Sequence, residues 1–361
     1  MSWPARVDIA IVNFHSAEDV RASLDALGPW THGTIWLIDN SCDTHEAQAL
    51  RQMAASCPEA RVLVAPENLG FGRGCNLAYA LSQAEYFLLL NPDARIAQQD
   101  LRRLLDAMQH DLVLGAVSPA TYWNTEKTFV LPLPSSQTPR AHALQIMASW
   151  VPPVTRCIAE HHVRLTQQHM ARSQPLTTDM LAGAVLLLRR SAVETAGGLF
   201  EPGYFMFFED ADLSIRLRRA GYQLALLPSA QAVHNYRHKP FKAELMTQSQ
   251  MRYFAWRQPS YLRLSGQLRG LERVARRVEP QQWFETLGTL DSAPAFRQAT
   301  QEARVLAFSP SLLMMPAIVR PAGLPSTGLS DSEWDLLEPG AYVAWLDATT
   351  ARRRWVHFVC A

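Results

Sequence analysis

The sequence predicts an α/β fold in which a mostly parallel sheet is flanked by helices, with a C-terminal helical and small β-containing extension. Two observations support this prediction. In residues 1–242, apolar runs of strand length alternate with amphipathic helical stretches. In residues 281–361 that alternation stops. Strands of a parallel sheet covered on both faces are near-continuous apolar runs, as here.

The elements of the first third follow one another with short connections. We expect strands at Val7–Val12, Thr34–Ile38, Arg61–Val64, Tyr86–Leu90 and Val113–Val117. We expect helices from Ser16 to Gly28, over His45–Ser56, from the Gly70–Gly74 turn to Leu81, and over Leu101–Met108. The first helix illustrates the signals, because Ser16 and Asp19 form a weak capping pattern and Gly28 is a typical stop.

The later elements are less regular. Residues 122–178 contain Pro132, Pro134, Pro139, Pro152 and Pro153, which predicts a loop with some helix. Then come an expected strand at Met180–Arg189, a helix at Glu209–Ala220, a strand at Gln223–Leu227, a helix at Leu245–Val278, and a hairpin of Ala341–Leu346 with Arg353–Cys360. We therefore expect a main domain over 1–242 with halves at about 1–120 and 121–242, a helical segment over 243–280, and a small α/β or β subdomain over 281–361.

Composition excludes several classes of protein. The 361 residues carry 34 Lys and Arg against 33 Asp and Glu, a net charge of +1, so no basic footprint indicates nucleic-acid binding. The five cysteines are widely spaced without a C-x-x-C pair, which argues against a disulfide framework or structural zinc. No apolar window approaches the roughly 18 residues of a membrane span. We expect a cytoplasmic location.

Polar residues stand where the predicted strands end. Asn13, Asp39, Asn40, Asn91 and Asp93 all occupy such positions. Ligands of open α/β sheets bind beyond the carboxyl ends of the strands, so this placement favours function. Asp39 can accept the imide N–H of a pyrimidine, and Asp93 can help to hold Mg²⁺ or Mn²⁺ beside a diphosphate. An Asx turn or an Asn-Pro-Asp turn is the structural alternative.

A glycine-rich stretch, Asn68–Asn76, precedes one of the predicted helices. Its glycines allow close approach of a ligand to the backbone, the helix start favours anions, and Arg73 can contact phosphate. The Gly-x-Gly-x-Gly spacing after the third strand differs from the dinucleotide fingerprint, which argues against a dehydrogenase or epimerase. A flexible turn without a ligand is the structural alternative.

Acidic residues open the helix predicted at Glu209. Glu209, Asp210 and Asp212 follow the apolar run Tyr204–Phe208, where apolar walls can raise the pKa of a general base. Complementation of the helix dipole explains one such acid but not three. His234 could bind metal or phosphate, although a lone histidine is more often structural.

These segments, taken in order, resemble the inverting family 2 glycosyltransferases of the GT-A (Rossmann-like) fold, particularly the bacterial rhamnosyltransferase-like branch. The resemblance covers about residues 7–238. The matching pieces are Ile11–Phe14, Leu37–Ser41, Asn68–Asn76, Leu89–Asp93, Leu181–Ala184, Gly197–Phe200, Tyr204–Asp212, Arg216 and Ala220–Tyr222. Two departures stand out: Asn91 replaces an acid, and Phe200-Glu201-Pro202 replaces Phe-Asp-Glu.

The resemblance implies a role for each matching residue. Asp210 would be the catalytic base, supported by Glu209. The nucleotide sugar would be lined by Asn13, Asp39, Asn40, Asn68, Arg73, Asn76, Asn91 and Asp93. The acceptor side would include Asp179, Gly183, Ala184 and Asp212. Asp93 and His234 would hold Mg²⁺ or Mn²⁺.

The implied activity is transfer of a sugar from a UDP- or dTDP-sugar, for instance dTDP-rhamnose, to a hydroxyl of a glycan or lipid-linked acceptor, in bacterial cell-surface polysaccharide synthesis. A degenerate nucleotide- or glycan-binding module is the alternative. A basic aromatic helix is either a solvated face or a peripheral contact with the inner face of the membrane. Its residues are Arg252, Tyr253, Trp256, Arg257, Tyr261, Arg263, Arg269, Arg273, Arg276 and Arg277.

Overall fold

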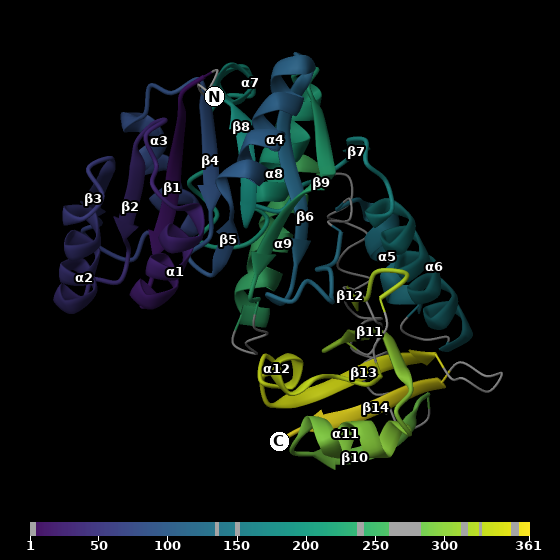
Figure 1. The fold of residues 1–361 in the computed structure, drawn as a ribbon. Coiled ribbons are helices and arrows are strands. Elements are labelled where there is room, and N and C mark those ends of the chain that lie inside the picture. The colour runs from purple at the N-terminus through teal and green to yellow at the C-terminus, as the bar shows by residue number, and fades with distance from the viewer. Residues whose placement is uncertain are drawn as a thin grey trace.

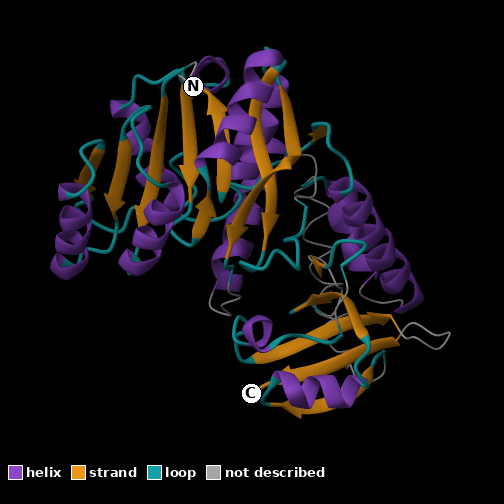
Figure 2. Ribbon diagram, viewed as in Figure 1, coloured by secondary structure: helices purple, strands orange, loops and turns teal. Residues whose placement is uncertain are grey.

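A computed structural model describes residues 5–133, 137–148, 152–236, 242–259, 283–311, 317–324, 327–347 and 354–361. These residues form two sheets, one of nine strands and one of five, with helices packed on both (Figures 1 and 2). In this part of the chain, no helix combines the length and the apolar character that crossing a membrane requires.

The larger sheet has the strand order β3-β2-β1-β4-β8-β6-β9-β5, and β7 also pairs with β9. Its strands are β1 (Val7–Asn13), β2 (Ile35–Asp39), β3 (Ala60–Val64), β4 (Tyr86–Leu90), β5 (Ala94–Ile96), β6 (Leu114–Tyr122), β7 (Leu176–Thr178), β8 (Val185–Arg189) and β9 (Gln223–His234). The first four strands are parallel, as are β6 and β9. β8, β5 and β7 run antiparallel to their neighbours, so the complete sheet is mixed.

The direction of β8 explains this departure from a mostly parallel sheet. The backbone N–H of Asn91, just after β4, donates to the carbonyl of Ala184, just before β8 (2.8 Å). β8 therefore starts at the edge where β4 ends. The strand was predicted from Met180 but begins only at Val185. The residues just before Val185 lie beyond the end of the sheet, at the edge where β4 ends.

Helices cover both faces of the larger sheet, as predicted. Ile9 and Ile11 of β1 pack with α1 (Ala17–Leu27), α2 (Thr44–Ala55) and α4 (Gln98–His110). Ala10 and Val12 face the other side, towards α3 (Phe71–Leu81), α7 (Arg190–Thr195) and α8 (Glu209–Arg219). Alternate residues of one buried strand thus contribute to two apolar layers, which is why the strand is apolar throughout.

Two differences from the expected elements have simple causes. The region predicted as a loop with some helix contains two helices, α5 (Pro139–Ala148) and α6 (Pro152–Met170), because proline is well tolerated in the first turn of a helix. β9 continues through His234 instead of ending at Leu227. Its pairing with β6 is interrupted after Leu227 and resumes at Gln231. Pro228 lies in this interruption, where its missing backbone N–H costs no hydrogen bond between the strands.

The smaller sheet has the order β10-β14-β13-β11-β12. Its elements are β10 (Glu285–Leu290), α11 (Ala293–Thr300), β11 (Arg304–Ser309), β12 (Ile318–Val319), α12 (Asp331–Trp334), β13 (Gly340–Asp347) and β14 (Arg354–Cys360). The antiparallel pairing of β13 with β14 confirms the predicted hairpin. α9 (Lys242–Arg257) matches the start of the predicted helical segment. Tyr261, Arg263, Arg269, Arg273, Arg276 and Arg277 lie outside the described residues.

The smaller sheet shares its apolar contacts with the rest of the chain. Ala159 and Val163 of α6 pack with Trp345 and Trp355 in one cluster. A second cluster combines α11, α12 and strands of the smaller sheet with residues 123 and 129, which follow β6. In Figure 1 the smaller sheet lies below the carboxyl-terminal ends of β6 and β9. Two apolar clusters thus contain residues from both sides of the domain boundary predicted at residue 281.

Candidate active site

Asn13 and Asp39 are neighbours at the carboxyl edge of the larger sheet, in register on β1 and β2. Both side chains are buried. The Asn13 amide donates to Asp39 Oδ1 (3.4 Å) and to Glu46 Oε2 (2.9 Å), and its oxygen accepts from the N–H of Ser16 (3.1 Å). Asn13 therefore orients Asp39 and the start of α1, and its amide is occupied by protein partners.

Asp39 has one carboxylate oxygen bound and one unbound. Oδ1 accepts from the N–H (3.1 Å) and the hydroxyl (2.6 Å) of Ser41. Oδ2 is buried and has no hydrogen-bond partner among the described residues. A buried carboxylate oxygen without a donor is costly, so this atom is suited to accept an N–H from a ligand. Ser41 was not singled out from the sequence, although it lies inside the matching segment Leu37–Ser41.

Asn40 and Asn68 shape the glycine-rich segment. The Asn40 amide donates to Asn68 Oδ1 (3.0 Å) and to the carbonyl of Gly70 (3.2 Å), and its oxygen accepts from the N–H of Leu69 (2.9 Å). Asn68 Oδ1 also accepts from the N–H of Gly70 (3.0 Å). The Asn40 side chain is thus used within the protein, whereas Asn68 is exposed.

The segment expected as a turn over Gly70–Gly74 is the beginning of α3. Gly70 precedes the helix with φ of 77°, and a Cβ there would lie 2.1 Å from the carbonyl oxygen of Phe205. This close approach lets the N–H of Phe71 donate to that carbonyl (3.0 Å). Arg73 lies in the first turn, partly exposed and 3.5 Å from Glu67, where it can reach an anion.

Asn76 lies further along α3 and faces the backbone of Phe200. Its amide nitrogen donates to the Phe200 carbonyl (2.8 Å), and its oxygen accepts from the Phe200 N–H (3.0 Å). Both polar atoms are therefore engaged within the protein. This geometry makes Asn76 a link between α3 and the loop before α8, and it differs from the expected contact with the nucleotide.

Asp93 and His234 meet because β5 pairs antiparallel with β9. Ala94 is the register partner of His234, and His234 Nε2 lies 3.1 Å from Asp93 Oδ1. The histidine is buried and about a third of the aspartate side chain is exposed. Asn91, two residues earlier, contributes its backbone to the turn, since its carbonyl accepts from the N–H of Ala94 (3.0 Å).

The Asp93–His234 pair can supply part of a metal site. Among the described residues, no group of three or more His, Cys, Asp or Glu side chains is placed to hold a metal ion. Mg²⁺ commonly binds through one or two carboxylates, such as that of Asp93, plus water and substrate phosphates. The pair fits that kind of site, and it does not fit a closed structural metal site.

Asp210 is held at the start of α8 by two backbone donors. Its Oδ2 accepts from the N–H of Gly183 (3.1 Å), and its Oδ1 accepts from the N–H of Ala211 (2.8 Å). Burial raises the pKa of this carboxyl, and the backbone hydrogen bonds oppose the shift. Because Gly183 precedes Ala184, which binds Asn91, the chain places Asp210 at the edge that carries Asp93.

Glu209 lies behind Asp210 in the protein interior. Its side chain is buried, and its Oε2 has no hydrogen-bond partner among the described residues. Burial, and secondarily the charge of Asp210, raises the pKa of Glu209 to about 8. Burial and the charge of Glu209 also raise the pKa of the Cys75 thiol on α3. A protonated Glu209 would leave Asp210 as the single negative charge of the pair.

Two residues expected on the acceptor side are used in ion pairs instead. Asp212 is fully buried, pairs with Arg216 (2.7 Å) and Arg257, and accepts from the Tyr204 hydroxyl (3.4 Å). No part of the Asp212 side chain is exposed, and this geometry gives it protein partners in place of the expected contact with the acceptor. Asp179 pairs with Arg218 (2.8 Å), at the other end of α8 from Asp210.

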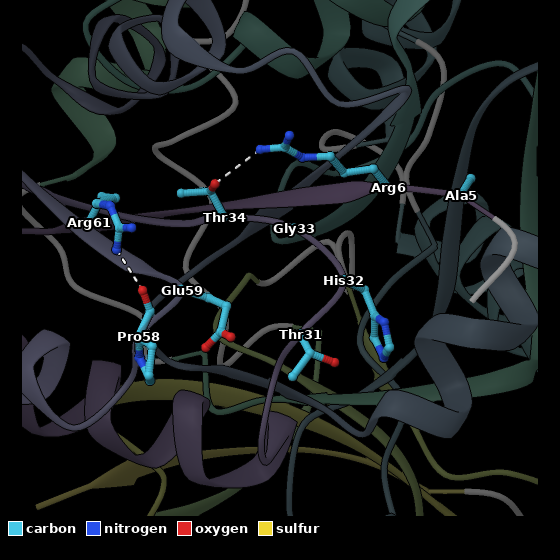
Figure 3. A pocket seen from close by; sticks show the side chains of 9 residues that line it. All are labelled: Ala5, Arg6, Thr31, His32, Gly33, Thr34, Pro58, Glu59 and Arg61. Atoms are coloured by element: carbon cyan, nitrogen blue, oxygen red, sulfur yellow. Dashed lines mark hydrogen bonds between the residues drawn. The ribbon is translucent and has the colours of Figure 1, made fainter. Parts of the chain in front are cut away.

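A cavity of about 620 Å³ lies elsewhere on the larger sheet (Figure 3). It is lined by residues at the amino-terminal ends of β1, β2 and β3, namely Ala5, Arg6, Thr31, His32, Gly33, Thr34, Pro58, Glu59 and Arg61. Arg6 donates to the Thr34 hydroxyl (3.3 Å) and Arg61 to the Pro58 carbonyl (2.6 Å). Since Asp39 and Asp93 follow the opposite ends of their strands, this cavity is separate from the candidate active site.

Comparison with known families identifies the class of protein. Residues 8–196 match the model of glycosyl transferase family 2, and residues 133–274 match that of glycosyl transferase family group 2. The chain belongs to glycosyl transferase family 2 and is a glycosyltransferase. This match confirms the family resemblance inferred from the motifs.

The similar curated proteins include rhamnosyltransferases. N-acetylglucosaminyl-diphospho-decaprenol L-rhamnosyltransferase of Mycobacterium tuberculosis (strain CDC 1551 / Oshkosh) is 27% identical over 220 residues, which cover 57% of this chain and 67% of the relative. Rhamnosyltransferase WbbL of Escherichia coli (strain K12) is 26% identical over 176 residues, 47% of this chain and 62% of the relative. The compared region thus spans about two thirds of these relatives.

The solved structures support the fold. A crystal structure of GalNAc-T7 with UDP, GalNAc and Mn²⁺ superposes with a TM-score of 0.52 at 13% identity, covering 72% of this chain and 49% of that one. At this identity the likeness concerns the architecture alone. It agrees with the predicted GT-A sheet flanked by helices.

Proposed function

We propose that this glycosyltransferase moves a hexose or deoxyhexose from a UDP- or dTDP-sugar to a saccharide hydroxyl, with inversion. dTDP-rhamnose is the favoured donor, because relatives are named as rhamnosyltransferases. The observation that carries the proposal is the half-buried carboxylate of Asp210. It is oriented by Gly183 and Ala211 at the sheet edge that also carries Asp39 and Asp93.

In the proposed reaction, Asp210 accepts the proton of the acceptor hydroxyl while the hydroxyl oxygen attacks the anomeric carbon. The bond from that carbon to the diphosphate oxygen breaks, and the nucleoside diphosphate leaves with the electron pair. One displacement from the opposite face inverts the configuration. A raised pKa brings a carboxylate closer to the basicity that this proton transfer needs.

Residues at this sheet edge would hold the donor and line the acceptor side. Oδ2 of Asp39 would accept the imide N–H of uracil or thymine, Arg73 would contact the diphosphate, and Gly183 and Ala184 would line the acceptor side. Asp93 and His234 would hold Mg²⁺ or Mn²⁺, which when bound neutralises charge developing on the diphosphate. The GalNAc-T7 structure contains UDP and Mn²⁺, which supports the proposed use of a nucleoside diphosphate with a divalent metal.

The proposed acceptor is a lipid-linked saccharide of cell-surface polysaccharide synthesis. This proposal rests on the mycobacterial relative, whose name specifies a decaprenol-linked acceptor. We propose a cytoplasmic location with peripheral contact at the inner face of the membrane, where such an acceptor is reached.

Thermal stability with UDP, dTDP, GDP or NAD, each with and without Mn²⁺, tests the donor class. A ligand that binds only the folded state raises Tm by mass action. We expect a Mn²⁺-dependent rise with UDP or dTDP. A rise with NAD alone would sink the proposal, and binding of a nucleotide sugar without hydrolysis or transfer would favour the degenerate binding module.

Asp210→Asn tests the base. We expect the variant to keep the Mn²⁺-dependent rise in Tm with the nucleotide and to lose about 10²- to 10⁴-fold in turnover, the usual contribution of a positioned base. Donor consumption measured by release of nucleoside diphosphate gives the rate. Turnover near the wild-type rate would show that another group removes the proton.

A further inference from the structure

The smaller sheet touches the strand end that carries His234. Tyr236, two residues beyond His234, packs against the apolar cluster formed by Phe308, Tyr342, Phe358 and their neighbours. The N–H of Tyr236 donates to the His234 carbonyl (2.6 Å). Tyr236 therefore links the backbone of His234 to the C-terminal region, because its N–H binds His234 and its side chain packs on that region.

Trp123 makes a second connection to the same place. Its indole N–H donates to the carbonyl of Tyr236 (2.9 Å), and its ring is buried. The ring meets Phe308 of β11 at 5.1 Å between centroids. Phe129 completes the group, 5.0 Å from Phe308. Packing against Phe308 of the smaller sheet thus orients the Trp123 ring, and with it the N–H that binds Tyr236.

Asn235, between His234 and Tyr236, ties this strand end to Asp93. Its N–H donates to the Asp93 carbonyl (3.2 Å), and its side-chain oxygen accepts from Arg95 (2.7 Å). A shift of residues 235 and 236 would therefore change the 3.1 Å approach of His234 Nε2 to Asp93 Oδ1. Groups behind a metal ligand commonly alter metal affinity in this indirect way.

We propose that the C-terminal region, residues 283–361, acts as a positioning element for the Asp93–His234 pair, with Trp123 and Tyr236 as the connection. The inference rests on the proposed metal-binding role of that pair. It gives a function to a region that the sequence motifs leave unexplained. Trp123 and Phe308 are positioning residues, since neither touches the pair directly.

Trp123→Phe is the main test, because it removes the indole N–H and keeps an aromatic ring in the cluster. Mn²⁺ binding would be measured without turnover, from the EPR signal of free Mn²⁺ in the presence of UDP or dTDP. Loss of one hydrogen bond predicts a dissociation constant raised about threefold to tenfold. The rate at saturating Mn²⁺ is expected to stay within about twofold of wild type.

Trp334→Phe is the matched control. Trp334 belongs to the same cluster and contacts Phe296 and Phe358, each at 6.0 Å between ring centroids. This substitution should lower Tm and leave the Mn²⁺ dissociation constant unchanged. Phe308→Leu, made in the C-terminal region itself, should weaken Mn²⁺ binding as Trp123→Phe does, and it carries the test if the tryptophan variant fails to fold.

The outcomes distinguish the positioning role of the C-terminal region from the metal-binding role of Asp93 and His234. Unchanged Mn²⁺ binding in Trp123→Phe and Phe308→Leu, with normal binding in wild type, would overturn the positioning role alone. Equal weakening in all three variants would also overturn it, since general destabilisation would then suffice. Absence of Mn²⁺ binding by wild type with either nucleotide would overturn the metal role of Asp93 and His234, and the positioning role with it.

Discussion

At the scale of single residues, Glu209 should make the stability of the protein depend on pH. Its pKa in the folded state, about 8, lies above the ordinary value of 4.5. Folding therefore favours the protonated form. This contribution to stability is fully present below about pH 4.5 and is lost as the pH rises through 8.

Glu209→Gln should remove that dependence, because the amide is neutral at every pH. We expect the Tm difference, variant minus wild type, to be larger at pH 9 than at pH 5 by ~2–6 °C. Scanning calorimetry across this range measures it, with the exposed Glu67→Gln as the control. Parallel curves for Glu209→Gln and wild type would mean that Glu209 titrates normally.

For single side chains, the sequence predicted the candidate site residues but not the residues they contact. Position at a strand end selected Asp39 and Asp93, and the acidic start of a predicted helix selected Asp210. His234 became a candidate metal ligand through the family resemblance. The partners were not predictable. The contact of His234 with Asp93 depends on the pairing of β5, a strand of three residues, with the end of β9.

At the scale of elements, α8 takes part in ion pairs of very different burial. Asp212 is inaccessible and pairs with Arg216 and with Arg257 of α9. Arg216 in turn donates to the carbonyls of residues 196, 198 and 199, ahead of the loop that leads to Asp210. Asp179 and Arg218 are both about half exposed.

Asp212→Ala should destabilise the protein strongly, because it leaves two guanidinium groups without their buried carboxylate. We expect a loss of about 3–5 kcal/mol in the free energy of unfolding, measured in urea. Asp179→Ala is the matched control, with an expected loss of about 0–1 kcal/mol for an exposed pair. Equal effects of the two substitutions would contradict the structural role of Asp212.

Periodicity predicted the strands and helices of the first third of the chain, because each buried strand is apolar on both faces. It did not predict β5, and it predicted only some helix within residues 122–178, where α5 and α6 form. A strand of three residues is too short for a period, and prolines mark helix starts as well as loops.

At the scale of the whole molecule, the two sheets should depend on each other for folding. Without residues 283–361, buried Trp123 and Phe129 and the inward face of α6 would be exposed to water. We expect a chain that ends at residue 282 to aggregate or to show a loosened 123–130 segment. Hydrogen exchange and sedimentation against the full chain measure this. A monomer with unchanged Tm and nucleotide binding would show that the first 282 residues fold independently.

The sequence by itself determined the family, the strand-helix alternation and most of the polar residues at the carboxyl edge. These properties are local: they depend on residue type, spacing and the apolar character of consecutive residues. Only the tertiary structure decided that Asn76 bonds to the backbone of Phe200, that Asp212 pairs with two arginines, and that His234 meets Asp93. It also decided that the C-terminal region packs against Trp123 and Tyr236. Those relations join residues far apart in the chain, and their partners are set by strand order and burial.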